Sequence, residues 1–69
     1  MFVFDYWLAD TGNSVRMVSR HTGIDQELLE DLRWGEVNLS PPQLLKLSRL
    51  TSIEPNEFGL TIEELREMR

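Results

Sequence analysis

The chain has 69 residues, a formal net charge of −5 and no cysteine. This length suffices for one domain with a small core, and the lack of cysteine excludes disulfide bonds and thiolate metal sites as reinforcement. No apolar run approaches the roughly 20 residues that cross a bilayer, and the opening residues lack the basic flank of a secretory signal. We therefore expect a cytoplasmic protein without a membrane partner, and a possible homodimer to supplement the core.

The acidic excess is unevenly distributed along the chain. Between Asn13 and Leu50, five basic residues balance five acidic ones, and the excess lies near the start and after Ile53. The negative net charge opposes attraction of the whole chain to a polyanion. The middle segment carries no net charge, so this repulsion does not apply to it.

The first segment, from Phe2 to Thr11, is rich in aromatic and apolar residues and stops at Gly12. Its weak alternation of apolar residues also permits a short strand, but the Gly-Asn stop favours a helix. We expect Tyr6 and Trp7 to contribute to the core.

Two short helices follow, joined by a tight turn. Ser14 can cap the first of them, which is the second helix of the chain. Its apolar residues are Val15 and Val18, with Met17 alongside. Thr22-Gly23 interrupts it. The third helix runs from Asp25, which can cap it, to about Trp34, and Gly35 ends it. Its apolar side carries Leu28, Leu29 and Leu32.

The remaining segments also carry start and stop signals. Ser40-Pro41-Pro42 starts a fourth helix. Its core face comprises Leu44, Leu47 and Leu50, with Leu45 near them. Pro55 opens a short fifth helix that directs Phe58 to the core. The capping box Thr61-Ile62-Glu63-Glu64 opens a tail helix with an apolar side made by Ile62, Leu65 and Met68, which either covers the core or forms a dimer contact.

The order of these pieces resembles the Cro/C1-type helix-turn-helix family, with its lambda-repressor-like domain. The resemblance is carried by Gly23-Ile24, Gly35, Leu44-Leu45-Lys46-Leu47-Ser48 and Ile53-Glu54-Pro55-Asn56-Glu57-Phe58. It implies an all-α, five-helix domain over residues 1–69, with a helix-turn-helix core at 14–35 and a short acidic C-terminal helix at 61–69. It further implies a transcriptional regulator whose third helix enters the major groove of double-stranded DNA, usually in a dimer.

The resemblance also indicates which residues would face DNA. The third-helix positions are Gln26, Glu27, Leu28, Glu30, Asp31 and Arg33. Glutamine can read adenine and glutamate can accept from cytosine, but three carboxylates repel phosphates, whereas counterion release requires cations. Val15 stands where the family often has a phosphate-binding glutamine. The expected phosphate contacts are therefore Ser14, Arg16 and Arg20, with His21 as further cationic help.

Each of these features has a second interpretation. Arg16 and Arg20 can instead be solvated or paired with Glu27 or Glu30, and Trp34 can anchor a partner or pack over the third and fourth helices. The stripe of Glu27, Glu30 and Asp31 can be a solvated face or a docking surface for a basic protein. An interaction module, such as an antirepressor or regulatory subunit, is thus the alternative to a DNA-binding protein.

Catalysis, cofactors and metals are not expected. The chain has no glycine-rich phosphate loop, no nucleophile with a nearby histidine and no second ligand for His21 at metal-binding spacing. We expect His21 to be a partly exposed residue at a helix end.

Overall fold

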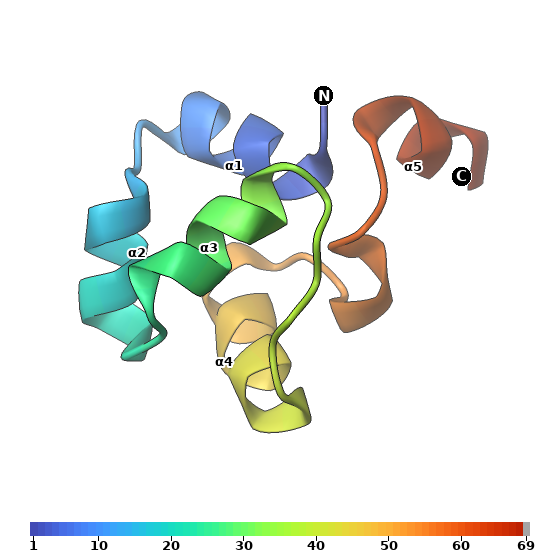
Figure 1. The fold of residues 1–69 in the computed structure, drawn as a ribbon. Coiled ribbons are helices and arrows are strands. Elements are labelled where there is room, and N and C mark those ends of the chain that lie inside the picture. Colours follow the sequence, from blue (N-terminus) through green and yellow to red (C-terminus); the bar gives the residue numbers. More distant parts are fainter. Residues whose placement is uncertain (69) are drawn as a thin grey trace.

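The computed structural model describes residues 1–68, which form an all-α domain. Its elements are α1 (Val3–Thr11), α2 (Val15–Thr22), α3 (Gln26–Arg33), α4 (Pro41–Thr51), the 3-10 turn η1 (Pro55–Glu57) and α5 (Ile62–Met68). Figure 1 shows α2 and α3 side by side at the left, α4 below them, and α5 at the right beside the start of α1. The predicted all-α class is confirmed, and a single isolated bridge between Phe2 and Thr61 is the only β-type pairing in the described residues.

The predicted helix starts are made by side-chain caps. The Oγ atom of Ser14 accepts a hydrogen bond from the amide of Met17 at 3.2 Å, and Oδ1 of Asp25 accepts from Glu27 at 3.1 Å. Ser40 forms a full capping box at the start of α4. Each of these contacts satisfies an amide that has no partner within its own helix, which fixes where the helix begins.

The ends of α2 and α4 share one arrangement that the sequence interpretation did not identify. The hydroxyl of Thr22 donates to the carbonyl of Val18 at 2.8 Å and accepts from the amide of Ile24 at 3.2 Å. Thr51 makes the same two hydrogen bonds, at the same distances, to Leu47 and Ile53. The residue after each threonine is left-handed, Gly23 in one case and Ser52 in the other. A buried threonine therefore closes both helices.

The core lies where α1, α2, α3, α4 and the segment after η1 meet. Its largest fully buried side chains are Phe4, Phe58, Ile24, Leu29, Leu32, Leu47 and Val18. Phe4 meets Phe58 edge-on with ring centroids 6.5 Å apart, which ties the first helix to the segment after η1. The predicted burial of Phe58 is thus confirmed.

Two expectations about the fold are wrong. Tyr6 is 42% exposed, because the inward residues of α1 are Val3, Phe4 and Leu8 and position 6 lies on the opposite side. Leu45 is 52% exposed, since α4 turns Leu47 to the core.

The predicted short fifth helix is present as the 3-10 helix η1, which opens at Pro55. The tail helix begins at Ile62, with Thr61 and Glu64 forming the predicted capping box, and Arg69 lies outside the described residues.

Candidate nucleic-acid interface

The α2–turn–α3 unit presents α3 on the surface and braces it with α2. The hydroxyl of Ser19 in α2 donates to the carbonyl of Ile24 at 2.6 Å, and the side chain of Ile24 is buried beneath the turn. Leu29 and Leu32 anchor the inner side of α3 in the core. These contacts fix the angle between the two helices, so that the outer side of α3 is held rigidly toward solvent.

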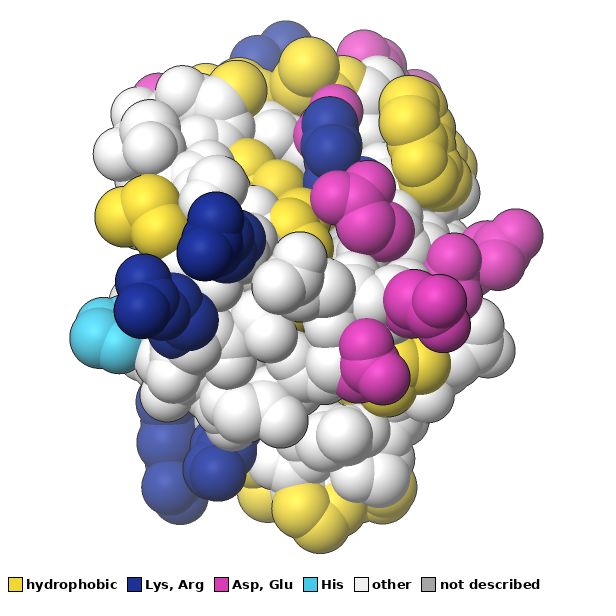
Figure 2. Space-filling model, turned by 60° about the vertical axis from the view of Figure 1, so that its left-hand side comes forward, with side chains coloured by type: hydrophobic (Ala, Val, Ile, Leu, Met, Phe, Trp, Pro, Cys, Tyr) yellow, Lys and Arg dark blue, Asp and Glu magenta, His cyan; other side chains and the backbone are white. Residues whose placement is uncertain are grey.

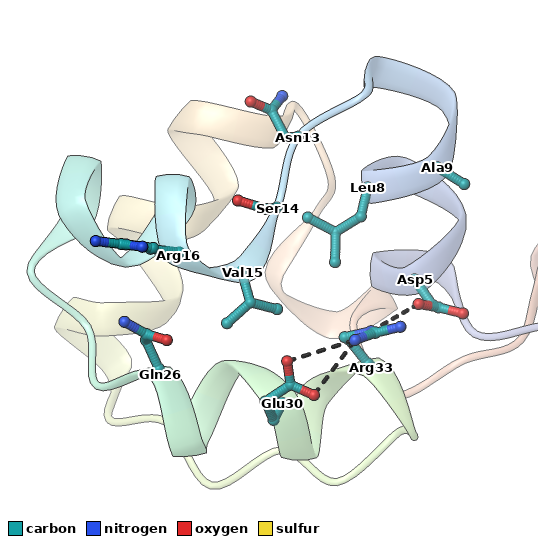
Figure 3. Close-up of a pocket in the computed structure, with 10 residues that line it drawn as sticks. All are labelled: Asp5, Leu8, Ala9, Asn13, Ser14, Val15, Arg16, Gln26, Glu30 and Arg33. Atoms are coloured by element: carbon teal, nitrogen blue, oxygen red, sulfur yellow. Dashed lines mark hydrogen bonds and ion pairs between the residues drawn. The ribbon is translucent and has the colours of Figure 1, made fainter.

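A depression of about 560 Å³ opens between α1, the start of α2 and α3 (Figure 3). Its lining contains five residues that the sequence interpretation assigned to the interface, namely Ser14, Arg16, Gln26, Glu30 and Arg33. Asp5 and Leu8 of α1, which were not assigned, line the same depression. The candidate phosphate contacts of α2 and the candidate base contacts of α3 therefore share one surface.

The exposed cations of this face lie on α2 and α4. Arg16 and Arg20 are exposed, and neither forms an ion pair within residues 1–68, so the predicted pairing with Glu27 or Glu30 is absent there. Lys46, whose ammonium group donates to the carbonyl of Thr22 at 3.3 Å, adds charge from α4 next to the end of α2. Figure 2 shows lysine and arginine side chains on the left of this face and carboxylates on the right.

The predicted third-helix positions differ in how far they reach solvent. Gln26, Glu27 and Glu30 are exposed, whereas Asp31 is half-buried. Leu28 is also half-buried and packs against the core, so it offers little surface to a ligand. The exposed outer side of α3 therefore presents one amide and two carboxylates to solvent. Of these, Gln26 and Glu30 line the depression of Figure 3.

Arg33 is held by two carboxylates. Its Nε atom donates to Oδ1 of Asp5 at 2.8 Å, and its NH1 atom lies 3.3 Å from Oε2 of Glu30. The hydrogen bond to Asp5 raises the pKa of the Arg33 guanidinium, although partial burial opposes this effect. Arg33 is thus already paired with one carboxylate of α1 and one of its own helix.

Trp34 lies at the end of α3 and is 65% exposed. The guanidinium carbon of Arg33 lies 5.9 Å from the centroid of its ring, within the range of a cation–π contact. The exposed fraction excludes the alternative in which Trp34 is packed over the third and fourth helices. His21 is exposed near the end of α2, as expected.

The chain matches no known family model, no curated protein and no solved structure. Residues 1–68 contain no helix long and apolar enough to span a membrane. In the same residues, no group of three or more histidine, aspartate or glutamate side chains is arranged to hold a metal ion.

Proposed function

We propose that the protein is a small cytoplasmic transcriptional regulator that binds double-stranded DNA through α2 and α3, as a helix-turn-helix resembling the Cro/C1 type. The observation that carries this proposal is the pair of exposed arginines on α2, Arg16 and Arg20, which have no ion-pair partner in the described residues. A cation that is not neutralised by a neighbour is available to a phosphate, and releasing counterions from DNA drives its binding.

The start of α2 supports a backbone contact at the same place. The Oγ atom of Ser14 is used as an acceptor by the amide of Met17, so its hydroxyl hydrogen is available to donate to a phosphate oxygen. Arg16 follows in the first turn, where the positive end of the helix dipole favours an anion. Ser14, Arg16 and Arg20 thus form the phosphate-binding side of the proposed interface.

The α3 helix supplies the proposed base contacts. Gln26 suits adenine, and the exposed carboxylates of Glu27 and Glu30 suit the amino group of cytosine. Because these carboxylates also repel phosphates, they lower the affinity for non-specific DNA and increase the dependence on a correct sequence. The charge of Glu30 is partly offset by Arg33 at 3.3 Å.

Substitution of the arginines tests this function. We expect Arg16→Ala and Arg20→Ala each to weaken binding to duplex DNA and to reduce the slope of log K against log salt by about one. The matched control is Arg66→Ala, which removes an exposed arginine from α5 and should leave the slope unchanged. Equal effects at all three positions would show that only the total charge matters, and would contradict the proposed interface.

A second candidate function is favoured by Trp34. An exposed tryptophan beside an acidic helix is typical of a protein-binding surface, because aromatic side chains contribute much of the binding energy in such interfaces. In this alternative, α3 binds a basic protein, as an antirepressor or regulatory subunit would. Replacing both Glu27 and Glu30 by Gln separates the two functions: it should strengthen DNA binding if α3 contacts DNA, and weaken binding of a basic partner if α3 contacts protein.

A further inference from the structure

A second depression, with no residue of α3 in its lining, has apolar walls and a basic rim. It has a volume of about 360 Å³ and lies between α1, α2 and α4. Its apolar lining comes from Trp7, Met17, Val18 and Leu50, and Asn13, Arg20 and His21 supply the polar atoms. No carboxylate lines it. We call it the α2–α4 pocket.

The chemistry of the α2–α4 pocket specifies its occupant. Pockets that receive organic groups begin at about 300 Å³, so an indole or another large apolar side chain can enter. Arg20 at the rim favours an occupant with negative charge next to its apolar group, because like-charged neighbours would be repelled. The pocket therefore fits an aromatic side chain carried on an acidic helix.

The chain itself displays such a group. Trp34 is 65% exposed at the end of α3. Four acidic residues, Glu27, Glu30, Asp31 and Glu36, lie within seven positions of it, against the single base Arg33. Arg33 is itself neutralised by Asp5 at 2.8 Å, so the surroundings of Trp34 stay acidic.

We propose that the α2–α4 pocket binds Trp34 of a second copy of this chain. The acidic α3 of one copy then faces the basic rim, including Arg20, of the other. Because the pocket and the tryptophan belong to different surfaces, the contact joins unlike faces and links copies head to tail. The contact does not require DNA, and it assigns the acidic side of α3 a binding partner in the assembly.

Self-association in this form would compete with DNA. Arg20 lines the α2–α4 pocket and is also one of the proposed phosphate contacts, so one arginine cannot serve both at once. DNA should therefore dissociate the assembled copies into DNA-bound units. The assembly itself is measured without DNA, so its failure and a failure of DNA binding are distinguishable.

Sedimentation velocity of the full chain tests the proposal. We expect the average mass to rise above that of a monomer with concentration in about 0.05 M salt, and to fall back in about 0.5 M salt as the ion pairs are screened. Trp34→Ala and Arg20→Glu should each weaken association at least tenfold. Leu45→Ala, which removes another exposed apolar side chain from α4, is the matched control and should have no effect. Circular dichroism verifies that each variant remains folded.

A mixture of the two weakened variants gives the decisive result. The Trp34→Ala copy keeps an intact pocket, and the Arg20→Glu copy keeps an intact tryptophan, so the mixture retains one productive contact. We expect the mixture to form dimers and nothing larger, while each variant alone is monomeric. A chain that is monomeric at low salt, association that survives both substitutions, or a mixture that stays monomeric would each overturn the proposal.

Discussion

The carboxylate of Asp5 in α1 holds the guanidinium group of Arg33 in α3, with Nε 2.8 Å from Oδ1. About a third of the arginine side chain and a fifth of the aspartate side chain remain exposed, at 33% and 21%. A residue outside the proposed helix-turn-helix thus holds a cation at the end of α3, together with Glu30 of α3 itself.

Removing Asp5 should therefore strengthen DNA binding. In Asp5→Ala, Arg33 loses its hydrogen bond to α1 and can turn toward a phosphate, which should steepen the slope of log K against log salt by about one. Fluorescence anisotropy with a labelled duplex measures this slope.

The control for Asp5→Ala is Glu67→Ala, which removes the same charge from an exposed position in α5. If Glu67→Ala steepens the slope equally, the effect belongs to net charge and Arg33 is not released. Asp5→Ala should also lower the free energy of unfolding by about 1 kcal/mol, at the upper end for a partly exposed ion pair.

Gly35 should tolerate no side chain. Its backbone φ is +86°, and a Cβ atom there would come within 2.7 Å of Cδ1 of Phe2. Gly35→Ala should cost about 2–4 kcal/mol of unfolding free energy, the sum of left-handed strain and overpacking. Gly12 has φ +73° and open space around it, so Gly12→Ala should cost only about 1 kcal/mol. Urea denaturation measures both free energies of unfolding. Equal losses in the two variants would show that the contact with Phe2 does not require glycine at position 35.

Replacing Ser52 by glycine should stabilise the fold. It is the one non-glycine residue with positive φ in the described residues, at 62°, and it ends α4 as Gly23 ends α2. Ser52→Gly should raise the free energy of unfolding by about 0.5–1 kcal/mol, because glycine adopts this conformation without strain. The reverse change, Gly23→Ser, should lower it by about the same amount. A loss on Ser52→Gly would mean that the serine side chain stabilises the turn.

The first turn of α5 should contribute to stability in a pH-dependent way. The pKa of Glu63 is lowered, chiefly because its own backbone amide donates to the carboxylate and secondly because the terminal ammonium group lies 3.7 Å away. A lowered pKa stabilises the fold above the pKa of the unfolded chain, and this contribution is lost as the pH falls through the folded value. Carboxyl chemical shifts in an NMR titration should place the pKa of Glu63 below its ordinary value, and Glu63→Gln should remove this part of the pH dependence.

Helix order was predictable because the signals are local. Ser14, Asp25, Ser40 and Thr61 cap the helices that their positions indicate, and Gly12, Gly23 and Gly35 end helices or turns with positive φ. Caps depend on residues two to four positions away, so one sequence suffices to identify them.

The contacts across the fold were not predictable in this way. Arg33 was expected to face a ligand, and its partner Asp5 lies 28 positions earlier in the chain. Periodicity also failed for Tyr6, since an aromatic residue in an aromatic-rich helix still points outward when its neighbours at positions 4 and 8 point inward. The pocket between α1, α2 and α4 likewise joins residues from three helices that no local pattern connects.

A salt series of binding to mixed-sequence duplex DNA tests the central claim most directly. Fluorescence anisotropy should show binding in about 20 mM salt, with log K falling linearly with log salt and a slope of about −2 or steeper, as contacts from Arg16 and Arg20 require. The absence of binding even at this low salt concentration, or binding that does not change with salt, would contradict a DNA-binding function for α2 and α3.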